Sequence, residues 1–539
     1  MRGKLLAIVV LGFLLRFLWV TQFPVGFTAD EAGQGYDAYS IARTGRDGWG
    51  EFLPLFPRGF GDYKAPLYMY FTVPSVAVFG LSEWSVRLPA VIVGTAAIVA
   101  TFGLAYEMFG ASVGLWAALL LAISPWHIQL SRTAWEGGVG VFLFSLGLWA
   151  YVKYVKGNKK AIYWAMAIFG VCTYAYHSWR LVSALFVMGL VLMRLWKKGV
   201  DRRFWSAILI FGLILIPTIS NWRVVLTRAA DVGIFSKSRI DGYFAGKGVS
   251  ALDSRLARVF DNKVLFVADQ FWGNYLSYFS PTFWFSANRP DDSYLNFPGT
   301  PLHYPFELVF ILVGGYLLLK EKRFGPLLLL WALLAPIPAA LTGAMSANRA
   351  VTFLPLSILV SAYGLVAVRG FVNKRVGVKW SNIGIGTLLG VFLLFFVYTY
   401  LYKLPTHPIH NQRFGYREVF KKAIEVENQY DSIHFSRRFS VPHIFVAFYK
   451  KMDPVEFQRA SLDWLRYEKS DKRYVDQLES YNLGKFEIHD LYWKADLKRK
   501  NALLVSEPDD FSTDTPSIFD MRNSRGEVIF RMVPTSKLP

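Results

Sequence analysis

The sequence predicts a polytopic α-helical membrane protein with about eleven transmembrane helices, followed by a small soluble α/β domain. Of 539 residues, 53% are hydrophobic and 17% are aromatic, and the mean hydropathy is +0.30. A soluble protein of this length is rarely so apolar. Apolar runs long enough to cross a bilayer recur up to residue 403, and the pattern changes in the tail from 404 to 539.

The first apolar run has a basic start, as a signal peptide does, but it contains Arg16 and lacks a small-residue cleavage site. We therefore expect an uncleaved first span. Ten further runs have the length and composition of transmembrane helices. The eleven predicted spans are 4–22, 84–106, 111–130, 138–155, 161–178, 181–196, 204–222, 306–320, 325–342, 350–370 and 383–402.

Basic residues gather in the connections on one side, except the turn at 106–112, which has none, whereas the turns on the opposite side are poor in Lys and Arg. This asymmetry places the N-terminus in the cytoplasm of a multi-pass plasma (inner) membrane protein. An odd number of spans then puts the large loops at 23–83 and 223–305 outside, together with the tail. The net charge of +20 belongs to loops beside anionic headgroups and does not indicate nucleic acid. The basic connections are 156–160, 194–203, 320–323 and 369–375.

The tail reads as a small extracytoplasmic α/β accessory domain. It lacks a dinucleotide-binding fingerprint, a Walker A sequence and metal-ligand spacing, so we assign it no catalytic part. We expect a truncation after Lys403 to keep some cleavage of the donor. Cys172 is the only cysteine, which excludes a disulfide within the chain and a cysteine metal cluster. The predicted tail elements are a helix over 415–429, strands over 431–437, 443–449 and 501–506, and a hairpin over 517–533.

The stretch TADEAGQGYDAYS (28–40) places two acids, Asp30 and Glu31, just outside the first span. Thr28 and Glu31 have the spacing of a helix capping box, so Glu31 has a structural explanation. Asp30 is not needed for that box, although an acid in the first helical turn also gains from the helix dipole. Asp30 is therefore the candidate catalytic carboxylate.

The segment GFGDYKAPLYMYFTVP (59–74) brings Asp62, Tyr63 and Lys64 to an apolar stretch at the membrane surface. Acids, a cation and aromatic side chains, with Tyr36 among them, would then converge on one interface. The alternative for Lys64 is a snorkelling side chain that binds lipid headgroups.

The chain resembles the polyprenyl-phosphate-dependent sugar transferases of glycosyltransferase family 39, which include protein O-mannosyltransferases and lipid A aminoarabinose transferases. The resemblance covers about residues 1–370. It implies the C-type glycosyltransferase (GT-C) fold and transfer of a sugar from a lipid-phosphate donor outside the cytoplasm. The motifs, in order, are the DE pair, GDYKAPLYMY, FGLSEWSVRLPAVIVG, SPWHIQLSRTAWEGG and TYAYHSWRL.

The resemblance also implies roles for single residues. Asp30 matches the loop acid, and a carboxylate suits a general base because a hydroxyl acceptor is a weak nucleophile. Lys64 matches the lysine of a K-P-type motif and would stabilise the leaving phosphate. Glu136, where the family usually carries Asp, has a surface ion pair as its equal alternative. Arg349, in LTGAMSANRAVTFLP, is the second phosphate ligand or an interfacial anchor.

The site expected from the sequence includes aromatic and histidine side chains, although an interfacial hydrogen-bonded histidine explains His177 as well. Arg87, in SVRLP, matches an arginine of the family motif, but an anchor to headgroups explains it equally. The predicted site comprises catalytic Asp30, Glu31 and Glu136; phosphate-binding Lys64, Arg349 and Arg132; and cavity residues Tyr36, Tyr63, Asp62, Tyr176, His177 and His303.

No cofactor is required by the sequence, and a divalent metal stays open. The position that would supply a Glu beside Lys64 is Tyr63, which leaves Asp62 as the nearby acid. The predicted partners are a polyprenyl-phosphate sugar, membrane lipids and a protein, lipid or envelope-glycan acceptor. A transporter or flippase of lipid-linked sugars is the competing function, although the chain lacks the paired repeats typical of transporters. A receptor or scaffold is a third, in which the acids would be dispensable.

Overall fold

The computed structural model divides into two compact units. The first unit contains residues 1–18, 90–131 and 136–397; the second contains 19–89, 132–135 and 398–539. Four residues of the predicted basic connection at 194–203, residues 197–200, lie outside the described residues. The structure describes residues 1–196, 201–246, 259, 261–289, 299–406, 414–470, 472, 474–496, 498–512 and 514–537.

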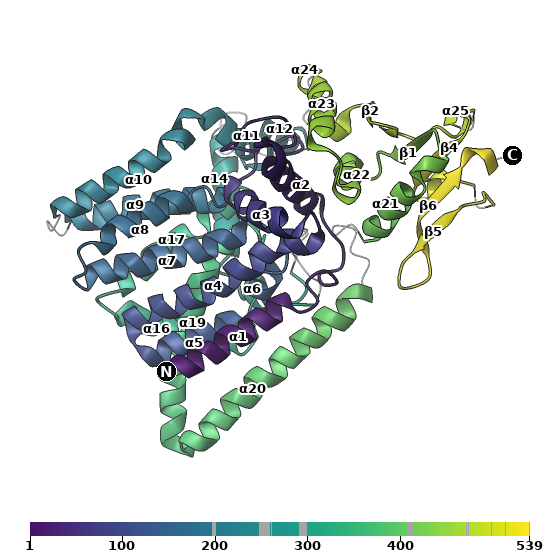
Figure 1. Ribbon diagram of the computed structural model, residues 1–539. Helices are drawn as coiled ribbons and strands as arrows, with labels where there is room; N and C mark the ends of the chain where they lie inside the picture. Colours follow the sequence, from purple (N-terminus) through teal and green to yellow (C-terminus); the bar gives the residue numbers. More distant parts are fainter. Residues whose placement is uncertain are drawn as a thin grey trace. The chain divides into compact units, whose positions relative to one another are not determined.

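The first unit is a helical bundle in which α7 packs on α8, α8 on α9 and α10, and α16 on α19 (Figure 1). Among the described residues, six helices are long and apolar enough to cross a membrane, and α4 begins in the second unit. The helices are α1 Arg2–Phe17, α4 Glu83–Phe109, α5 Ala111–Ile123, α6 Pro125–Leu130, α7 Gly137–Val155, α8 Ala161–Cys172, α9 His177–Trp196, α10 Arg202–Ser220, α11 Trp222–Val232, α12 Lys237–Gly246, α14 Lys263–Ser277, α15 Pro281–Phe285, α16 Glu307–Lys320, α17 Gly325–Leu334, α18 Ile337–Ala340, α19 Leu354–Val376 and α20 Val378–Tyr398.

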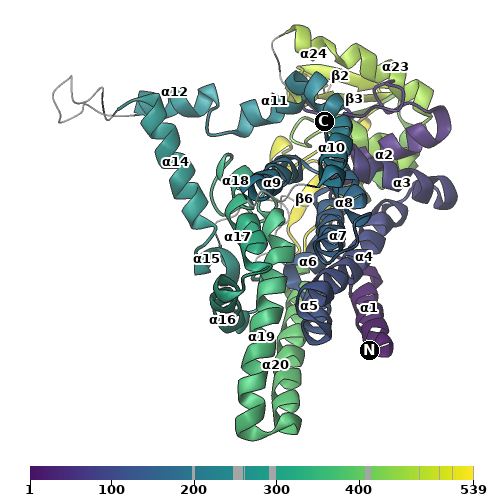
Figure 2. The ribbon, with the colours of Figure 1, turned by 90° about the vertical axis from the view of Figure 1, so that its left-hand side faces the viewer.

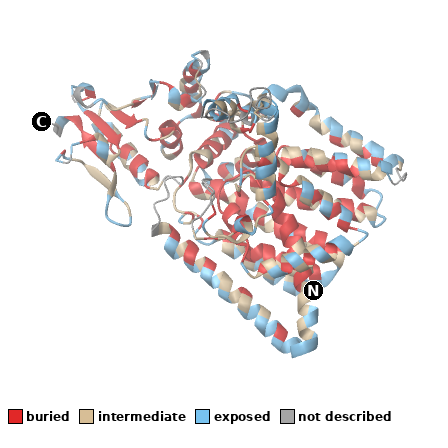
Figure 3. Ribbon diagram, turned by 180° about the vertical axis from the view of Figure 1, so that it is seen from behind, coloured by how far each residue is buried: buried red, intermediate tan, exposed pale blue. Residues whose placement is uncertain are grey.

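Every predicted span overlaps a helix, but several helices are shorter than expected, and the count of eleven spans stays a prediction. The run at 111–130 breaks at Ser124, because Pro125 restricts the residue before it to extended backbone, and Ser124 caps the next helix. The long helices α19 and α20 stand out in Figure 2. Only 22% of the apolar window within the span that contains α20 is buried, and Figure 3 shows mostly exposed and intermediate residues along this helix. Exposed apolar helices of this length are expected in a multi-pass membrane protein.

Arg16 lies in the first apolar helix and is fully buried. Its guanidinium donates to the carbonyl oxygens of Leu121 and Ala122 at 3.0 and 2.9 Å and lies 2.7 Å from Nδ1 of His127. These contacts fasten α1 to the end of α5, and a buried charge is retained only where such partners satisfy it. Arg16 therefore has a structural explanation that does not require a transport pathway.

The second unit joins the loop after the first helix to the tail. Two helices, α2 and α3, pack against each other, and α2 also packs on α22 and α23 of the tail. A six-stranded sheet has the order β2-β3-β1-β4-β6-β5, with β1 parallel to β3 and β4 and the remaining pairs antiparallel. The elements are α2 Ala29–Thr44, α3 Pro66–Phe79, α21 Tyr416–Glu425, β1 Ser432–Ser436, α22 Pro442–Lys450, α23 Pro454–Trp464, α24 Arg466–Lys469, β2 Ser480–Leu483, β3 Phe486–His489, α25 Trp493–Asp496, β4 Ala502–Ser506, β5 Phe519–Arg522 and β6 Val528–Pro534.

One predicted tail strand was wrong. Residues 443–449 form most of helix α22, which begins at Pro442, a residue whose fixed φ suits the first helical position. The continuous apolar run is buried on most sides, so its periodicity did not distinguish a buried strand from a buried helix. Phe445 of this helix lies 5.2 Å from Phe420 of α21, which stacks on Phe435 of β1 at 4.6 Å. The two helices thus cover the Phe435 face of the sheet.

Candidate functional site

Asp30 and Lys64 come together in the second unit. Asp30 lies in the first turn of α2, and its carboxylate is 3.5 Å from Nζ of Lys64. The Asp30 side chain is 47% exposed and the Lys64 side chain only 9%. The Lys64 ammonium lies over the Phe60 ring, and a side-chain carbon at Gly33 would come within 3.0 Å of it. A reachable carboxylate therefore sits beside a largely buried cation.

Glu31 is held by contacts that explain it structurally. It completes the predicted capping box, since its Oε2 accepts from the Thr28 N–H at 3.0 Å and the Thr28 hydroxyl accepts from its own N–H. Its two oxygens also receive a bidentate pair of bonds from Arg87, at 2.8 and 3.0 Å. The Ala134 N–H donates to it as well. These contacts favour the capping interpretation, and a catalytic role for Glu31 stays a prediction.

Arg87 contacts protein groups in the structure, whereas the sequence left a headgroup anchor as an equal explanation. It is fully buried, and it donates to Glu31 and to the carbonyl oxygens of Val20 and Gly26 at 2.8 and 2.7 Å. Arg87 therefore ties the segment after the first helix to the start of α2. The bidentate geometry that a guanidinium makes with a carboxylate adds orientation to this contact.

Tyr36 and Asp37 face the interior of the second unit. The Tyr36 hydroxyl donates to the carbonyl oxygen of Met452 in the tail at 3.0 Å, and its ring lies 4.6 Å from Phe457. Asp37 is buried and accepts from the Gly48 N–H at 3.0 Å. Tyr36 is thus a packing residue between α2 and the tail in this structure, and its place in a substrate cavity stays a prediction.

A second buried acid, Asp47, lies in the turn after α2, where its Oδ1 accepts from the N–H groups of Trp49 and Glu51 at 2.9 Å. Its other oxygen is buried without a hydrogen-bond partner among the described residues. Burial is the main cause that raises the pKa of Asp37 to about 6 and that of Asp47 to about 7. The nearby charges act in opposite directions, since Lys64 lowers the pKa of Asp37 and Asp37 raises that of Asp47.

These shifts predict that the second unit loses stability as the pH rises from about 4 to about 7. The folded chain holds more protons than the unfolded chain over this window, so the free energy of unfolding falls with pH. Asp47→Asn should flatten the dependence. Thermal unfolding of the detergent-solubilised protein at several pH values measures this, with the exposed Asp463→Asn as the control. Equal slopes for wild type and Asp47→Asn would contradict the assignment.

The remaining predicted residues of the second unit lie in two places. Arg132 is buried, donates to the carbonyl oxygen of Phe23 at 3.0 Å and lies over the Tyr400 ring; burial lowers the pKa of Arg132. Asp62 and Tyr63 belong to the turn before Lys64, in which the Asp62 carbonyl accepts from Gly59 at 2.6 Å. That turn holds Lys64 in place.

In the first unit, four predicted residues gather at the starts of α7 and α9. Glu136 is the residue before α7, and His177 begins α9 next to Tyr176. Trp179 donates to the Gly137 carbonyl at 2.9 Å, which joins the two helix starts. The Ser178 hydroxyl donates to the carbonyl of Arg349, also at 2.9 Å. Glu136, Tyr176, His177 and Arg349 thus come from three separate parts of the sequence into one region.

His303 contacts a different set of residues. It is fully buried, with Nδ1 3.1 Å from Glu307 and Nε2 2.9 Å from the Ser357 hydroxyl. The rings of Trp126 and Trp284 surround it. Both ring nitrogens have partners, so the contacts favour a structural histidine, and a cavity role for His303 stays a prediction.

A divalent metal at Asp30 does not fit the arrangement. Lys64 already occupies the position of a countercharge, and a divalent oxygen site needs several oxygen ligands. Within the described parts of the chain, the acids and histidines that converge closely enough to hold an ion do not include Asp30 or Asp62. The chemistry considered below therefore uses the side chains alone.

Residues 63–222 match the model of the dolichyl-phosphate-mannose-protein mannosyltransferase family. The family resemblance inferred from the sequence is confirmed. Two Bacillus subtilis (strain 168) proteins described as putative mannosyltransferases are similar in sequence. YycA is 24% identical over 177 residues, which cover 32% of this chain and 26% of YycA. YkcB is 22% identical over 164 residues, covering 30% of this chain and 23% of YkcB. The chain thus matches about a quarter of the length of these relatives.

The fold is similar to that of ArnT from Cupriavidus metallidurans in its apo crystal structure. That likeness covers 100% of this chain and 99% of ArnT, at a TM-score of 0.51 and 13% sequence identity. Identity this low carries the fold and not the activity. The chain therefore has a fold similar to that of ArnT, and the segment that matches the family model includes Lys64, Arg132 and Glu136.

Proposed function

We propose that this protein is an inverting membrane glycosyltransferase that moves a sugar from a polyprenyl-phosphate donor to a hydroxyl acceptor on the outer face of the membrane. The contact between exposed Asp30 and buried Lys64 is the observation that carries the proposal. The family that matches residues 63–222 is named for a dolichyl-phosphate-linked mannose, which supports a polyprenyl-phosphate donor. Mannose or a related sugar is the proposed group transferred, and a protein is one proposed acceptor.

In this proposal Asp30 takes the proton of the acceptor hydroxyl while the oxygen attacks the anomeric carbon. The bond from that carbon to the phosphate oxygen breaks, and the polyprenyl phosphate leaves with the electron pair and added negative charge. Lys64, a largely buried cation in the same loop, is proposed to stabilise that charge. Attack from the face opposite the phosphate inverts the anomeric centre.

A synthetic polyprenyl-phosphate mannose offered to the purified protein tests the function. Transfer to an acceptor, or slow release of free mannose, supports an enzyme. The competing transporter or flippase predicts that the protein moves the intact donor across a vesicle membrane without breaking the sugar–phosphate bond. Intact donor after long incubation with wild-type protein and candidate acceptors, together with donor translocation, would replace the enzyme by the transporter.

Lys64→Ala and Arg349→Ala should each raise the donor concentration that gives half-maximal rate. They should raise the corresponding acceptor concentration less. Both cations are proposed to hold the lipid phosphate, and a hydrogen bond to a charged group contributes about 1.5–3 kcal/mol, which is roughly a 10- to 150-fold change. Donor and acceptor saturation curves measure the two effects. Lys422→Ala is the control, because Lys422 pairs with Glu425 in the tail. Donor curves that overlay the wild type would contradict the phosphate roles.

The tail is proposed to be extracytoplasmic. We also propose that it supports the loop that carries Asp30 and Lys64. Gln458 donates to the hydroxyl of Ser40 at 3.0 Å, and the Val475 N–H donates to the carbonyl of Phe60 at 3.2 Å. Phe27 packs on Phe448 with ring centres 4.8 Å apart. These contacts connect the tail to α2 and to the turn before Lys64.

We therefore expect a truncation after Lys403 to lose donor cleavage by about 100-fold or more, because small displacements of catalytic groups have effects of that size. This replaces the expectation from sequence that cleavage survives. Gly35→Ala tests the packing with the tail present, since an added carbon would lie 2.5 Å from Val86 and 2.9 Å from Phe448. Gly212→Ala is the control, with no atom within 4 Å. A folded truncation with wild-type cleavage would show that the tail is dispensable.

A further inference from the structure

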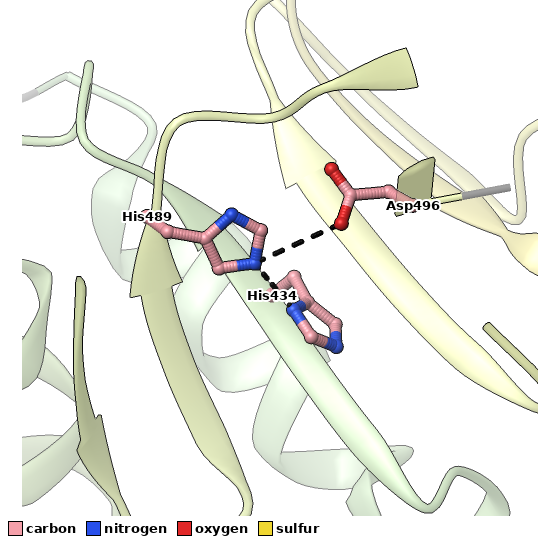
Figure 4. A group of neighbouring side chains, drawn as sticks. All are labelled: His434, His489 and Asp496. Atoms are coloured by element: carbon pink, nitrogen blue, oxygen red, sulfur yellow. Dashed lines mark hydrogen bonds and ion pairs between the residues drawn. The ribbon is translucent and has the colours of Figure 1, made fainter. Parts of the chain in front are cut away.

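Polar side chains gather on the sheet face opposite Phe435. His434 of β1 is paired in register with Glu487 of β3, and two positions further along β3 lies His489. Side chains at alternate positions of a strand share a face, so these three project together. Asp496, from the short helix α25, approaches the same place (Figure 4). His434, His489, Asp496 and Glu487 are called the histidine cluster below.

The donor atoms of the histidine cluster converge on one point. Nδ1 of His434 lies 2.7 Å from Nε2 of His489. A carboxylate oxygen of Asp496 lies 3.9 Å from Nε2 of His489. A carboxylate oxygen of Glu487 lies 3.5 Å from Nδ1 of His434. Four ligands placed tetrahedrally at zinc's usual bond lengths are about 3.3 Å apart. The separations of 3.5 and 3.9 Å lie near this spacing, and the two imidazoles need to move apart by about 0.6 Å to admit an ion.

The outer nitrogens of both imidazoles have partners that aim the inner nitrogens into the cluster. Nδ1 of His489 is 2.8 Å from the carbonyl oxygen of Asp490. A carbonyl only accepts, so this nitrogen carries the proton and Nε2 is left with a lone pair. Nε2 of His434 is 2.7 Å from the Ser432 hydroxyl and 3.4 Å from a guanidinium nitrogen of Arg499. Outer partners of this kind orient histidine ligands in metal sites.

The charges of the cluster also suit a cation. Asp496 is buried and Glu487 is partly exposed, and Arg499 contacts both carboxylates, at 3.2 and 3.0 Å. In the metal-free chain Arg499 supplies the positive charge that buried carboxylates need. Two imidazole nitrogens with carboxylate oxygens are ligands that Zn²⁺ accepts, whereas Ca²⁺ and Mg²⁺ prefer oxygen alone.

We propose that the histidine cluster binds one Zn²⁺ ion or a similar transition-metal ion, which ties β1 and β3 to the segment that carries Asp496. The site is separate in the sequence from Asp30 and Lys64, and the proposal does not depend on the transferase activity. Its proposed ligands are spread over residues 434 to 496, so no short sequence motif predicts the site. The partly exposed Glu487 and Arg499 mark the side from which an ion enters.

The alternative explanation of the cluster is a direct hydrogen bond between the two histidines without a metal ion. To separate them, the full-length protein in detergent is stripped with a chelator and titrated with Zn²⁺ in competition with a coloured chelator. Co²⁺ is then added to the stripped protein, because its visible absorption bands report four-coordinate geometry. The test variants are His489→Gln and Asp496→Asn. His443→Gln is the control, because His443 is another buried tail histidine, bonded to Tyr481.

We expect one Zn²⁺ per wild-type chain, the bands of four-coordinate Co²⁺, and a rise in melting temperature with Zn²⁺. Loss of a partner outside the ligand shell weakens metal binding about 10- to 100-fold, so each ligand variant should lose at least that much while the His443 variant does not. A wild-type chain that binds no Zn²⁺, or ligand variants with unchanged Zn²⁺ affinity, would overturn the proposal. If a ligand variant fails to fold, the wild-type Co²⁺ spectrum decides: four-coordinate bands support the site, and the spectrum of hydrated Co²⁺ excludes it.

Discussion

Asp30→Asn should reduce sugar transfer by about 10²- to 10⁴-fold, the range typical of a lost general base. Asparagine has nearly the shape of aspartate, but it cannot take the proton of the acceptor hydroxyl. The fold should be retained, because Asp30 is half-exposed and is not needed for the capping box of α2. Initial rates at saturating donor and acceptor, measured on purified protein, give the ratio directly.

A matched control for Asp30→Asn is the same substitution at a second exposed acid. Asp463 lies in α23, pairs with Arg466 and is 69% exposed, so Asp463→Asn should keep the wild-type rate. Both variants should elute and melt as the wild type does. A purified Asp30→Asn protein that turns over at the wild-type rate would remove Asp30 as the base and with it the proposed mechanism.

Arg87→Gln should destabilise the second unit by about 3–5 kcal/mol, because it leaves the buried Glu31 carboxylate without its charged partner. The pair is fully enclosed, at 0% exposure for Arg87 and 3% for the Glu31 side chain. Glu31→Gln should be costly for the same reason, even though glutamine still completes the capping box. The sequence alone indicated the capping box of Glu31 but not its contact with Arg87.

The double variant Glu31→Gln with Arg87→Gln separates the pair from its surroundings. It removes both charges, so its loss of stability should be smaller than the sum of the two single losses. Thermal unfolding in detergent and limited proteolysis measure all four proteins. Arg417→Gln serves as the control, because its ion pair with Glu83 is partly exposed and should contribute less. Additive losses in the double variant would show that the two side chains act independently.

The parts of the fold that depend on local composition could be predicted from the sequence. Apolar runs that must satisfy their backbone hydrogen bonds inside a membrane form helices, and each predicted span overlaps one. The capping box at Thr28 and Glu31 was also predicted, because its residues are three positions apart. The helix at 442–450 was not, because a run that is buried on most sides has no useful periodicity.

The sequence by itself determined the membrane class, the family resemblance, and the first-loop acids and lysine as candidates. Only the tertiary structure decided which of them meet. It placed Lys64 beside Asp30, enclosed Glu31 with Arg87, and gave both ring nitrogens of His303 a partner. It also gathered the histidine cluster from residues up to 62 positions apart along the tail. Contacts between residues so far apart depend on how helices and strands pack, and no local pattern in the chain records that packing.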